Sequence, residues 1–135
     1  MTIAPLPSLS VIIPALNAAN VIEACLEAIF AQEYSGQLDV TVAVGPSSDN
    51  TKEVLARWAA QEHRLQVVDN PTGRTPTALN LAIAASRGDI VARVDAQSVL
   101  PAGYLQQAVS TLLRTGAGNV GGIQHPVGDE GTQRI

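Results

Sequence analysis

The residues best suited to chemistry lie at the end of an apolar run. Residues 89–94 are Asp-Ile-Val-Ala-Arg-Val, and Asp95, Ala96, Gln97 and Ser98 follow them. The β-branched residues of the run indicate a buried strand that ends at Asp95. In an open parallel sheet, ligands bind outside the carboxyl ends of the strands. A carboxylate there can hold a divalent cation or a ribose hydroxyl.

Three other segments could complete a site around Asp95. They are Pro14–Asn17, Gly45–Asp49 and Gly73–Arg74. The first two offer backbone groups and small polar side chains, among them Asn17 and Ser47, which suit a flat base and a ribose. Arg74 adds a fixed positive charge on a planar donor fork that suits phosphate. With a cation at Asp95, these parts together describe a site for a nucleotide diphosphate.

The elements that must position these loops alternate along the chain. Apolar runs predict strands at residues 9–13, 38–44, 65–68, 89–95 and 119–123. Helical spacing and capping residues predict helices at residues 18–32, after Asp49 or Asn50, from Thr75 with Pro76 at its first position, and from Pro101 to Arg114. Gly88 is interpreted as a left-handed C-cap of the third helix. We therefore expect an α/β fold: a doubly wound, mostly parallel sheet with helices on both faces.

Composition narrows the class of protein. The chain has 135 residues, of which 46% are hydrophobic and 15% charged, so we expect one globular domain with a real core. Aromatic residues make up only 3%, so the core must be aliphatic. The net charge of −4 and the lack of a basic stripe argue against a nucleic-acid partner.

The sequence also bears on the cellular location of the protein. A single cysteine, Cys25, excludes an internal disulfide and a cysteine zinc site, and is compatible with the reducing cytoplasm. The N-terminus lacks the basic region of a signal peptide. No uncharged apolar run approaches the ~18 residues of a membrane span.

Several candidate residues also have purely structural explanations. Arg93 lies two residues before Asp95, on the same face of the predicted strand, so the two side chains could form an ion pair. Asp49 is better suited to capping a helix than to contacting a ligand. Asn17 and Ser47 are ordinary turn residues, and Arg74 could be a solvated loop residue.

The motifs in order along the chain resemble those of family 2 glycosyltransferases of the GT-A fold, in particular the bacterial exopolysaccharide-synthesis type. The matching segments are Ser10–Asn17, Pro46–Thr51, Asn70–Arg74, Ala78–Ala82, Ser86–Asp89, Arg93–Gln97 and Leu100–Leu105. Each motif alone is loose, but the ordered set is specific and extends from about Leu9 to about Ile123.

The resemblance implies a role for each matching position. The backbone around Pro14 and Ala15 would meet the nucleotide, and Arg74 would lie near the base or the diphosphate. Asp95 would contact the ribose or, with Gln97, a Mn²⁺ or Mg²⁺ ion. The implied partners are a nucleotide-diphosphate sugar donor and a carbohydrate or lipid-linked acceptor. The implied reaction is inverting transfer of the sugar to an acceptor hydroxyl in polysaccharide or glycolipid synthesis.

Three positions depart from the family pattern. Val44 and Gly45 stand where the family has an acidic pair, and one of these carboxylates usually reads the base. Gln97 replaces the second Asp of the metal motif. The family's catalytic base belongs to a segment downstream of this chain. We therefore interpret residues 1–135 as the donor-binding, N-terminal part of a longer enzyme, inactive alone.

This interpretation places the protein in the cytoplasm or at the cytoplasmic face of a membrane. Any membrane association would come from a region outside this chain.

Two alternatives from other classes stay open. A nucleotidyltransferase-like enzyme would share a nucleotide and metal site at a sheet edge. It would normally carry a glycine-rich basic loop after the first strand, whereas residues 15–18 are Ala-Leu-Asn-Ala. A non-catalytic module that binds nucleotide sugars is compatible with the departures at Val44, Gly45 and Gln97.

Overall fold

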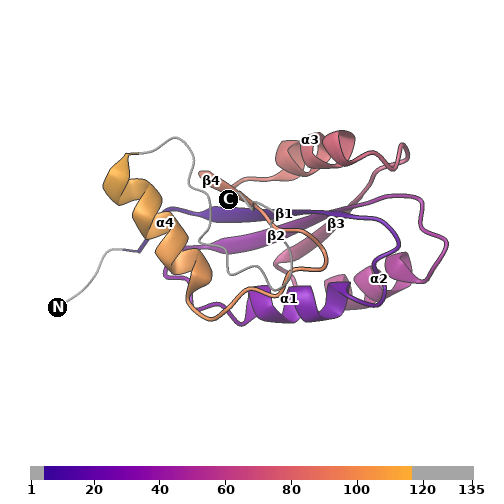
Figure 1. The fold of residues 1–135 in the computed structure, drawn as a ribbon, viewed down its shortest axis with the longest axis horizontal. Helices are drawn as coiled ribbons and strands as arrows, with labels where there is room; N and C mark the ends of the chain where they lie inside the picture. The colour runs from indigo at the N-terminus through magenta and orange to yellow at the C-terminus, as the bar shows by residue number, and fades with distance from the viewer. Residues whose placement is uncertain (1–4, 117–135) are drawn as a thin grey trace, which may run out of the picture.

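Four strands and four helices alternate along the chain in the computed structural model, which describes residues 5–116 (Figure 1). The strands are β1 (Leu9–Ala15), β2 (Leu38–Val44), β3 (Leu65–Asp69) and β4 (Ile90–Arg93). The helices are α1 (Ile22–Phe30), α2 (Thr51–Gln61), α3 (Thr75–Ala85) and α4 (Tyr104–Thr115). The predicted α/β class is confirmed.

The strands form one parallel sheet in the order β3-β2-β1-β4. From β1 the chain winds outward through β2 to β3, and then crosses back to place β4 on the other side of β1. The direction of winding therefore reverses between β1 and β4. Such a reversal opens a crevice at the carboxyl ends of the two strands, where α/β proteins bind ligands.

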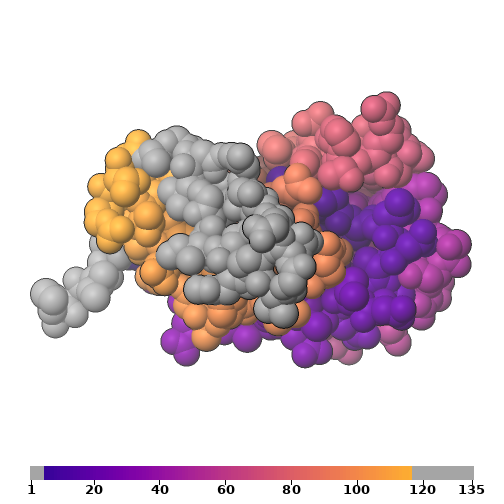
Figure 2. Space-filling model, viewed as in Figure 1, coloured from indigo at the N-terminus to yellow at the C-terminus, as the bar shows by residue number. Residues whose placement is uncertain are grey.

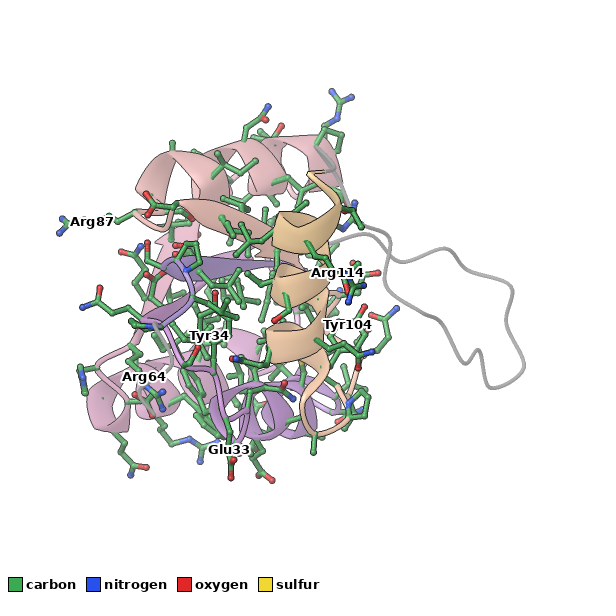
Figure 3. The ribbon with its side chains drawn as sticks, turned by 90° about the vertical axis from the view of Figure 1, so that its left-hand side faces the viewer. Glu33, Tyr34, Arg64, Arg87, Tyr104 and Arg114 are labelled. Atoms are coloured by element: carbon green, nitrogen blue, oxygen red, sulfur yellow. The ribbon has the colours of Figure 1, made fainter. Side chains whose placement is uncertain are left out.

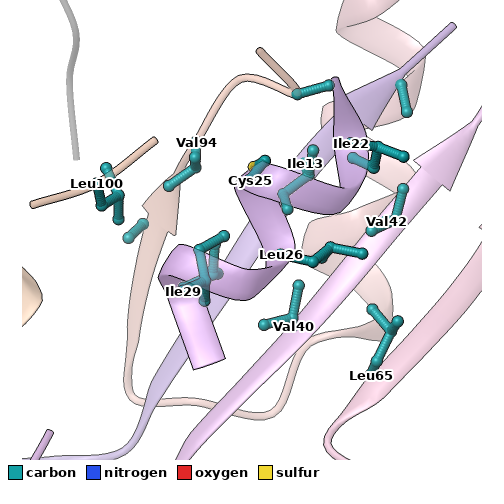
Figure 4. Packing of buried hydrophobic residues seen from close by; sticks show 14 of the residues in the cluster. Ile13, Ile22, Cys25, Leu26, Ile29, Val40, Val42, Leu65, Val94 and Leu100 are labelled. Carbon is teal, nitrogen blue, oxygen red and sulfur yellow. The ribbon is translucent and has the colours of Figure 1, made fainter. Parts of the chain in front are cut away.

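The helices cover both faces of the sheet, as the sequence predicted. Helices α1 and α2 lie on one face and α3 lies on the other (Figure 1). The larger core cluster joins α1 and the sheet, and Ile13, Val40 and Val42 pack against Leu26 and Ile29 in Figure 4. Aliphatic side chains fill this core almost entirely, as the low aromatic content required. Within residues 5–116, no helix is long and apolar enough to span a membrane.

The face under α3 has a thinner core of small residues. Ile12 and Ala43 of the sheet meet Ala78 and Ala82 of the helix. Ile83, on the same helix, is 48% exposed. Because alanines line the buried side of α3, the helix can lie close to the sheet.

Strand β1 continues two residues past Ile13, where Pro14 was predicted to stop it. The backbone N–H of residue 14 would point toward β4, whose pairing with β1 ends at Ile12 and Arg93. The missing donor of Pro14 therefore breaks no ladder hydrogen bond, which is the condition that lets proline stay in a strand. On the other side, Ala15 still accepts a hydrogen bond from the Gly45 N–H, 2.8 Å.

Other predicted boundaries shift by a few residues. Helix α1 is shorter than predicted, because the Ala18 carbonyl accepts bonds from the Val21 and Ile22 N–H groups in a preceding turn. Strand β4 ends at Arg93, before Asp95, and α3 includes Thr75, with Arg74 at its N-cap. Helix α4 begins after Gly103, which has φ +78°, rather than at Pro101. The strand predicted at residues 119–123 lies outside the described residues.

Gly88 does not form a left-handed C-cap, and this prediction was wrong. Ser86 ends α3 in an extended conformation, with φ −83° and ψ 150°. Gly88 is required instead by close packing, since a Cβ atom there would lie 2.6 Å from the Ser10 backbone nitrogen. The Gly88 N–H also donates to the Ser10 hydroxyl at 2.8 Å. The glycine thus lets the chain enter β4 directly beside β1.

We expect the substitution Gly88→Ala to lower the free energy of unfolding by about 1–3 kcal/mol, because the added methyl group must push β1 and β4 apart. Urea denaturation measures the change. The neighbouring exposed substitution Arg87→Ala is the control, with an expected change within about 0.5 kcal/mol. An equal, small effect of both substitutions would contradict the role of Gly88.

Candidate functional site

A cleft of about 270 Å³ opens at the carboxyl ends of β1 and β4, where the winding of the sheet reverses. Its lining residues come from three places: the end of β1, the turn before α3 with its first residues, and the segment after β4. They are Pro14, Ala15, Leu16, Asn70, Gly73, Arg74, Thr75, Ala78, Arg93, Asp95, Ala96 and Gln97. In Figure 2, the orange segment after β4 lies beside the indigo segment after β1, and the salmon helix α3 borders both.

The turn that presents Arg74 is built around Asn70, which the sequence analysis did not single out. Asn70 is 2% exposed, and its side-chain amide donates to the Arg74 carbonyl at 3.1 Å. The Asn70 side-chain oxygen accepts a bond from the Thr72 hydroxyl at 2.8 Å. Gly73 completes the turn with φ +70°. These contacts fix the backbone of Arg74, while its guanidinium has no ion-pair partner among residues 5–116.

Asp95 forms the ion pair with Arg93 that strand alternation had suggested. Arg93 Nε lies 3.2 Å from Asp95 Oδ1, and both side chains line the cleft. The Asp95 carbonyl accepts bonds from the Ser98 N–H at 2.9 Å and from Cys25 Sγ at 3.5 Å. Burial, and then the nearby Asp95 charge, raise the pKa of the Cys25 thiol to about 12. Cys25 is therefore an unreactive core residue that supports the backbone under Asp95.

The charges of the cleft come from three residues. Arg74 and Arg93 are positive and Asp95 is negative, and the other lining residues carry no ionisable side chain. The cleft therefore has a net charge of one positive unit near neutral pH, although the whole chain is at −4. Such a site favours an anion over a cation or a neutral ligand.

The donor atoms at the cleft fit a cation whose remaining ligands come from a substrate. Asp95 offers a carboxylate and Gln97 an amide oxygen, both of them hard donors. Among residues 5–116, there is no group of three or more His, Cys, Asp or Glu side chains that could hold a metal ion. Mg²⁺ and similar ions are commonly held by one or two carboxylates together with substrate phosphates. Asp95 and Gln97 fit a site of this kind, in which substrate phosphates provide further ligands. They do not form a complete metal site made of protein side chains alone.

Asn17 and Ser47 do not line the cleft. The Asn17 N–H donates to the Ser47 hydroxyl at 3.0 Å, and the Asn17 side-chain oxygen accepts a bond from the Ser48 N–H at 2.7 Å. Asn17 also has φ +49°, a left-handed conformation that asparagine tolerates better than most residues. The two residues tie the loop after β1 to the loop after β2.

Asp49 supports the same junction of loops. One carboxylate oxygen accepts bonds from the Thr51 N–H and hydroxyl, and the other accepts from the Ala19 N–H at 3.2 Å. Asn50 stands at the N-cap of α2 but makes no capping bond with its side chain. Asp49 therefore stabilises the start of α2, in line with its structural explanation, and does not line the cleft.

The backbone of the loop after β2 lies very close to the backbone of the turn before α3. A Cβ atom at Gly45 would lie 3.2 Å from the Gly73 Cα and 3.0 Å from Leu16 Cδ1. The preceding residue, Val44, is 3% exposed and packs in the core. A side chain at position 45 would require Leu16 or the turn at Gly73 to shift, the Val44 side chain packs in the core, and neither residue lines the cleft.

Of the six predicted donor contacts, the cleft brings together Pro14, Ala15, Arg74 and Asp95, and it also includes Gln97. Asn70 and Arg93 are additions. Strand alternation placed Arg93 beside Asp95, and this was the signal that it belonged to the same site. Asn70 belongs to the matching segment Asn70–Arg74, but its structural role was not predicted, because a buried asparagine in a turn cannot be distinguished by sequence from an exposed one.

Asn17→Ala should lower the free energy of unfolding by about 1–3 kcal/mol, because it removes the bond to Ser48 and places a Cβ-bearing residue without a local polar contact at φ +49°. Asn17→Gly keeps the backbone conformation accessible and loses only the side-chain bond, so we expect a smaller loss. Chemical denaturation of both variants separates the two contributions. Equal stabilities of the two variants would contradict the backbone contribution.

The stability contributed by Asp49 should depend on pH. Hydrogen bonds from Thr51 and from the Ala19 N–H hold the pKa of its carboxyl below the ordinary 3.8. A lowered pKa in the folded state stabilises the protein above pH 3.8, and this contribution is lost as the pH falls through the folded-state value. The stability difference between the wild type and Asp49→Asn should therefore be constant from pH 7 to 5 and shrink below pH 4. Denaturation at a series of pH values measures it, and a constant difference throughout would exclude this role.

Known proteins resemble this chain in both sequence and structure. Residues 10–135 match the family model described as Glycosyl transferase family 2. Succinoglycan biosynthesis protein ExoA of Rhizobium meliloti is 34% identical over 112 residues, which cover 82% of this chain and 34% of ExoA. Glycosyltransferase AglE of Haloferax volcanii is 32% identical over 134 residues, covering 96% of this chain and 44% of AglE. The chain therefore spans less than half the length of either relative.

Solved structures show the same arrangement of elements. The mannosyltransferase PcManGT of Pyrobaculum calidifontis, in complex with GDP-Man and Mn²⁺, superposes with a TM-score of 0.72 at 33% identity, covering 88% of this chain and 36% of that protein. TarS of S. aureus gives a TM-score of 0.73 at 21% identity, covering 89% of this chain and 23% of TarS, which is a likeness of fold alone.

Proposed function

The chain belongs to glycosyl transferase family 2, and we propose that its cleft binds the nucleotide diphosphate of a sugar donor. The observation that carries the proposal is the meeting of Arg74, Arg93 and Asp95 in one cleft at the point where the sheet reverses its winding. Two guanidinium groups suit a diphosphate, and the carboxylate suits a cation or a ribose hydroxyl. PcManGT, at 33% identity, was solved with GDP-Man and Mn²⁺, which supports this class of ligand.

The proposed reaction is transfer of the sugar to an acceptor hydroxyl with inversion at the anomeric carbon. The bond from that carbon to the diphosphate oxygen breaks as the bond to the acceptor oxygen forms, and a general base takes the acceptor proton. Arg74 stabilises the negative charge that develops on the leaving diphosphate. A bound Mn²⁺ or Mg²⁺ ion, held by Asp95 and Gln97 with phosphate oxygens, would supply further charge neutralisation.

The rest of the proposal concerns the whole protein. We infer that residues 1–135 form the donor half of a longer enzyme and that the base lies outside them. This half alone would then bind the donor without efficient turnover. The acceptor we propose is a carbohydrate or a lipid-linked sugar in polysaccharide or glycolipid synthesis, and the location is the cytoplasm or the cytoplasmic face of a membrane. Family membership favours this activity over the nucleotidyltransferase alternative.

The donor site can be tested by thermal unfolding with UDP, GDP, dTDP and CMP, each with and without Mn²⁺. A nucleotide at about 100 times its dissociation constant should stabilise the protein by about 2.7 kcal/mol, a shift of several degrees. We expect a cation-enhanced shift with one of the diphosphates. No shift with any of these nucleotides in the full-length protein would rule out the proposed site.

The substitution Asp95→Ala should abolish the part of this shift that depends on Mn²⁺. Asp89→Ala is the matched control, because Asp89 is an exposed carboxylate at the other end of β4, away from the cleft. If Asp95→Ala keeps the full Mn²⁺ effect, the assignment of Asp95 to the cation is wrong.

A further inference from the structure

We propose that Arg93 is a second phosphate-binding arginine of the cleft, held in position by Asp95, so that a nucleoside diphosphate still binds when the divalent cation is removed. The inference rests on the proposed donor site and adds to it a specific residue and a specific dependence on the cation. Neither the spacing of the motifs nor the family match assigns a role to Arg93.

The first support is the way in which Arg93 contacts Asp95. The ion pair uses Nε of the guanidinium and Oδ1 of the carboxylate, at 3.2 Å. The two terminal nitrogens of Arg93 and the second oxygen of Asp95 have no hydrogen-bond partner within residues 5–116. The pair therefore leaves the fork of the arginine available for a phosphate and one carboxylate oxygen available for a cation.

The second support is the position of the pair. Arg93 lies on the sheet face that carries α3, Asp95 follows two residues later beyond the end of β4, and both line the cleft that Arg74 also lines. The side chains of Arg93 and Asp95 are 44% and 37% exposed, so a ligand can reach them. A diphosphate bound between α3 and the end of β4 would meet one arginine from each side.

The third support is the balance of charge. With Gln97 in place of a second carboxylate, the two arginines outnumber the single negative side chain of the cleft. A neutral amide oxygen also binds a divalent cation more weakly than a carboxylate does. In this cleft the two arginines therefore neutralise more of the negative charge of the diphosphate, and the cation neutralises less of it.

Holding Arg93 on Asp95 also reduces the cost of binding. A free arginine side chain loses much of its rotational freedom when it grips a phosphate, which weakens binding. The contact through Nε restricts the side chain before the ligand arrives and leaves the bidentate fork exposed. Asp95 is in this respect a positioning residue for Arg93, in addition to its proposed role toward the cation.

The test measures the affinity of the full-length protein for UDP and GDP by calorimetry, first with Mn²⁺ and then with EDTA. For the nucleotide that binds, we expect removal of the cation to weaken binding by no more than about tenfold in the wild type. Arg93→Gln should weaken diphosphate binding in EDTA by roughly 10- to 100-fold, the range expected for charge-assisted hydrogen bonds. Arg93→Lys should fall between the two, because it keeps the charge but loses the fork.

Two comparisons separate this role from a general disturbance of the site. The corresponding monophosphate, UMP or GMP, should lose less affinity than the diphosphate when Arg93 is changed. Arg87→Gln is the control variant, because Arg87 is an exposed arginine at the opposite end of the sheet, where Figure 3 shows it pointing away from the protein. It should leave nucleotide affinity unchanged, and thermal unfolding without ligand should show that all variants are folded.

The outcomes distinguish this inference from the proposed function. If the wild type binds neither nucleotide even with Mn²⁺, the donor site itself is wrong. If the wild type binds with Mn²⁺ but Arg93→Gln has the same diphosphate affinity in EDTA, the donor site stands and Arg93 is only the partner of Asp95. Binding that disappears entirely in EDTA would also overturn the inference, because it would make the cation indispensable.

Discussion

The pairing of β4 with β1 is the constraint on which the cleft depends. Gly88 makes that pairing accessible, since any larger residue would collide with the backbone at Ser10 where the chain enters β4. The register then places Arg93 beside Ile12 and carries the following residues to the end of β1. Because β4 joins β1 on the side away from β2, the segments after β1 and β4 and the start of α3 meet around one crevice. A shift of this strand pair would move Arg93 and Asp95 relative to Arg74, which is held separately in the turn before α3.

The loops at this edge have two different tasks. Asn17, Ser47 and Asp49 bind neighbouring loop atoms and hold the segments after β1 and β2 together. Arg74, Arg93 and Asp95 instead direct charged groups into the cleft. The polar groups that bind neighbouring loop atoms are not available to a ligand. They do fix the backbone at Pro14 and Ala15, which the proposed ligand would contact. The first three residues thus make the loops rigid, and this rigidity holds in place the cleft in which the other three would contact the proposed ligand.

The sequence predicted the class of the fold and most of the cleft, because both follow from periodic patterns and from the rule that strand ends meet at one edge. It did not predict features that depend on distant contacts. Pro14 stays in β1 because its nitrogen faces the side where β4 pairing has ended, and only the strand order reveals this. Gly88 after a helix has two explanations, a left-handed cap or a close approach, and Ser10 decides between them from 78 residues away. Asn17 and Ser47 were candidate ligands because sequence shows that a loop residue is polar, but not which atom it faces.

The close contact between Gly45 and Gly73 connects one departure from the family pattern with the turn that presents Arg74. Where the family has an acidic pair, this chain has a buried valine and a glycine whose missing side chain lets the loop after β2 touch the turn that presents Arg74. A side chain at position 45 would press on the Gly73 Cα and on Leu16 Cδ1, so the glycine at this position and the close placement of the turn before Arg74 go together. In the proposed donor site, a base would contact backbone groups and the residues Pro14, Ala15 and Leu16, and the diphosphate would lie at Arg74 and Arg93, the two positive side chains of the cleft.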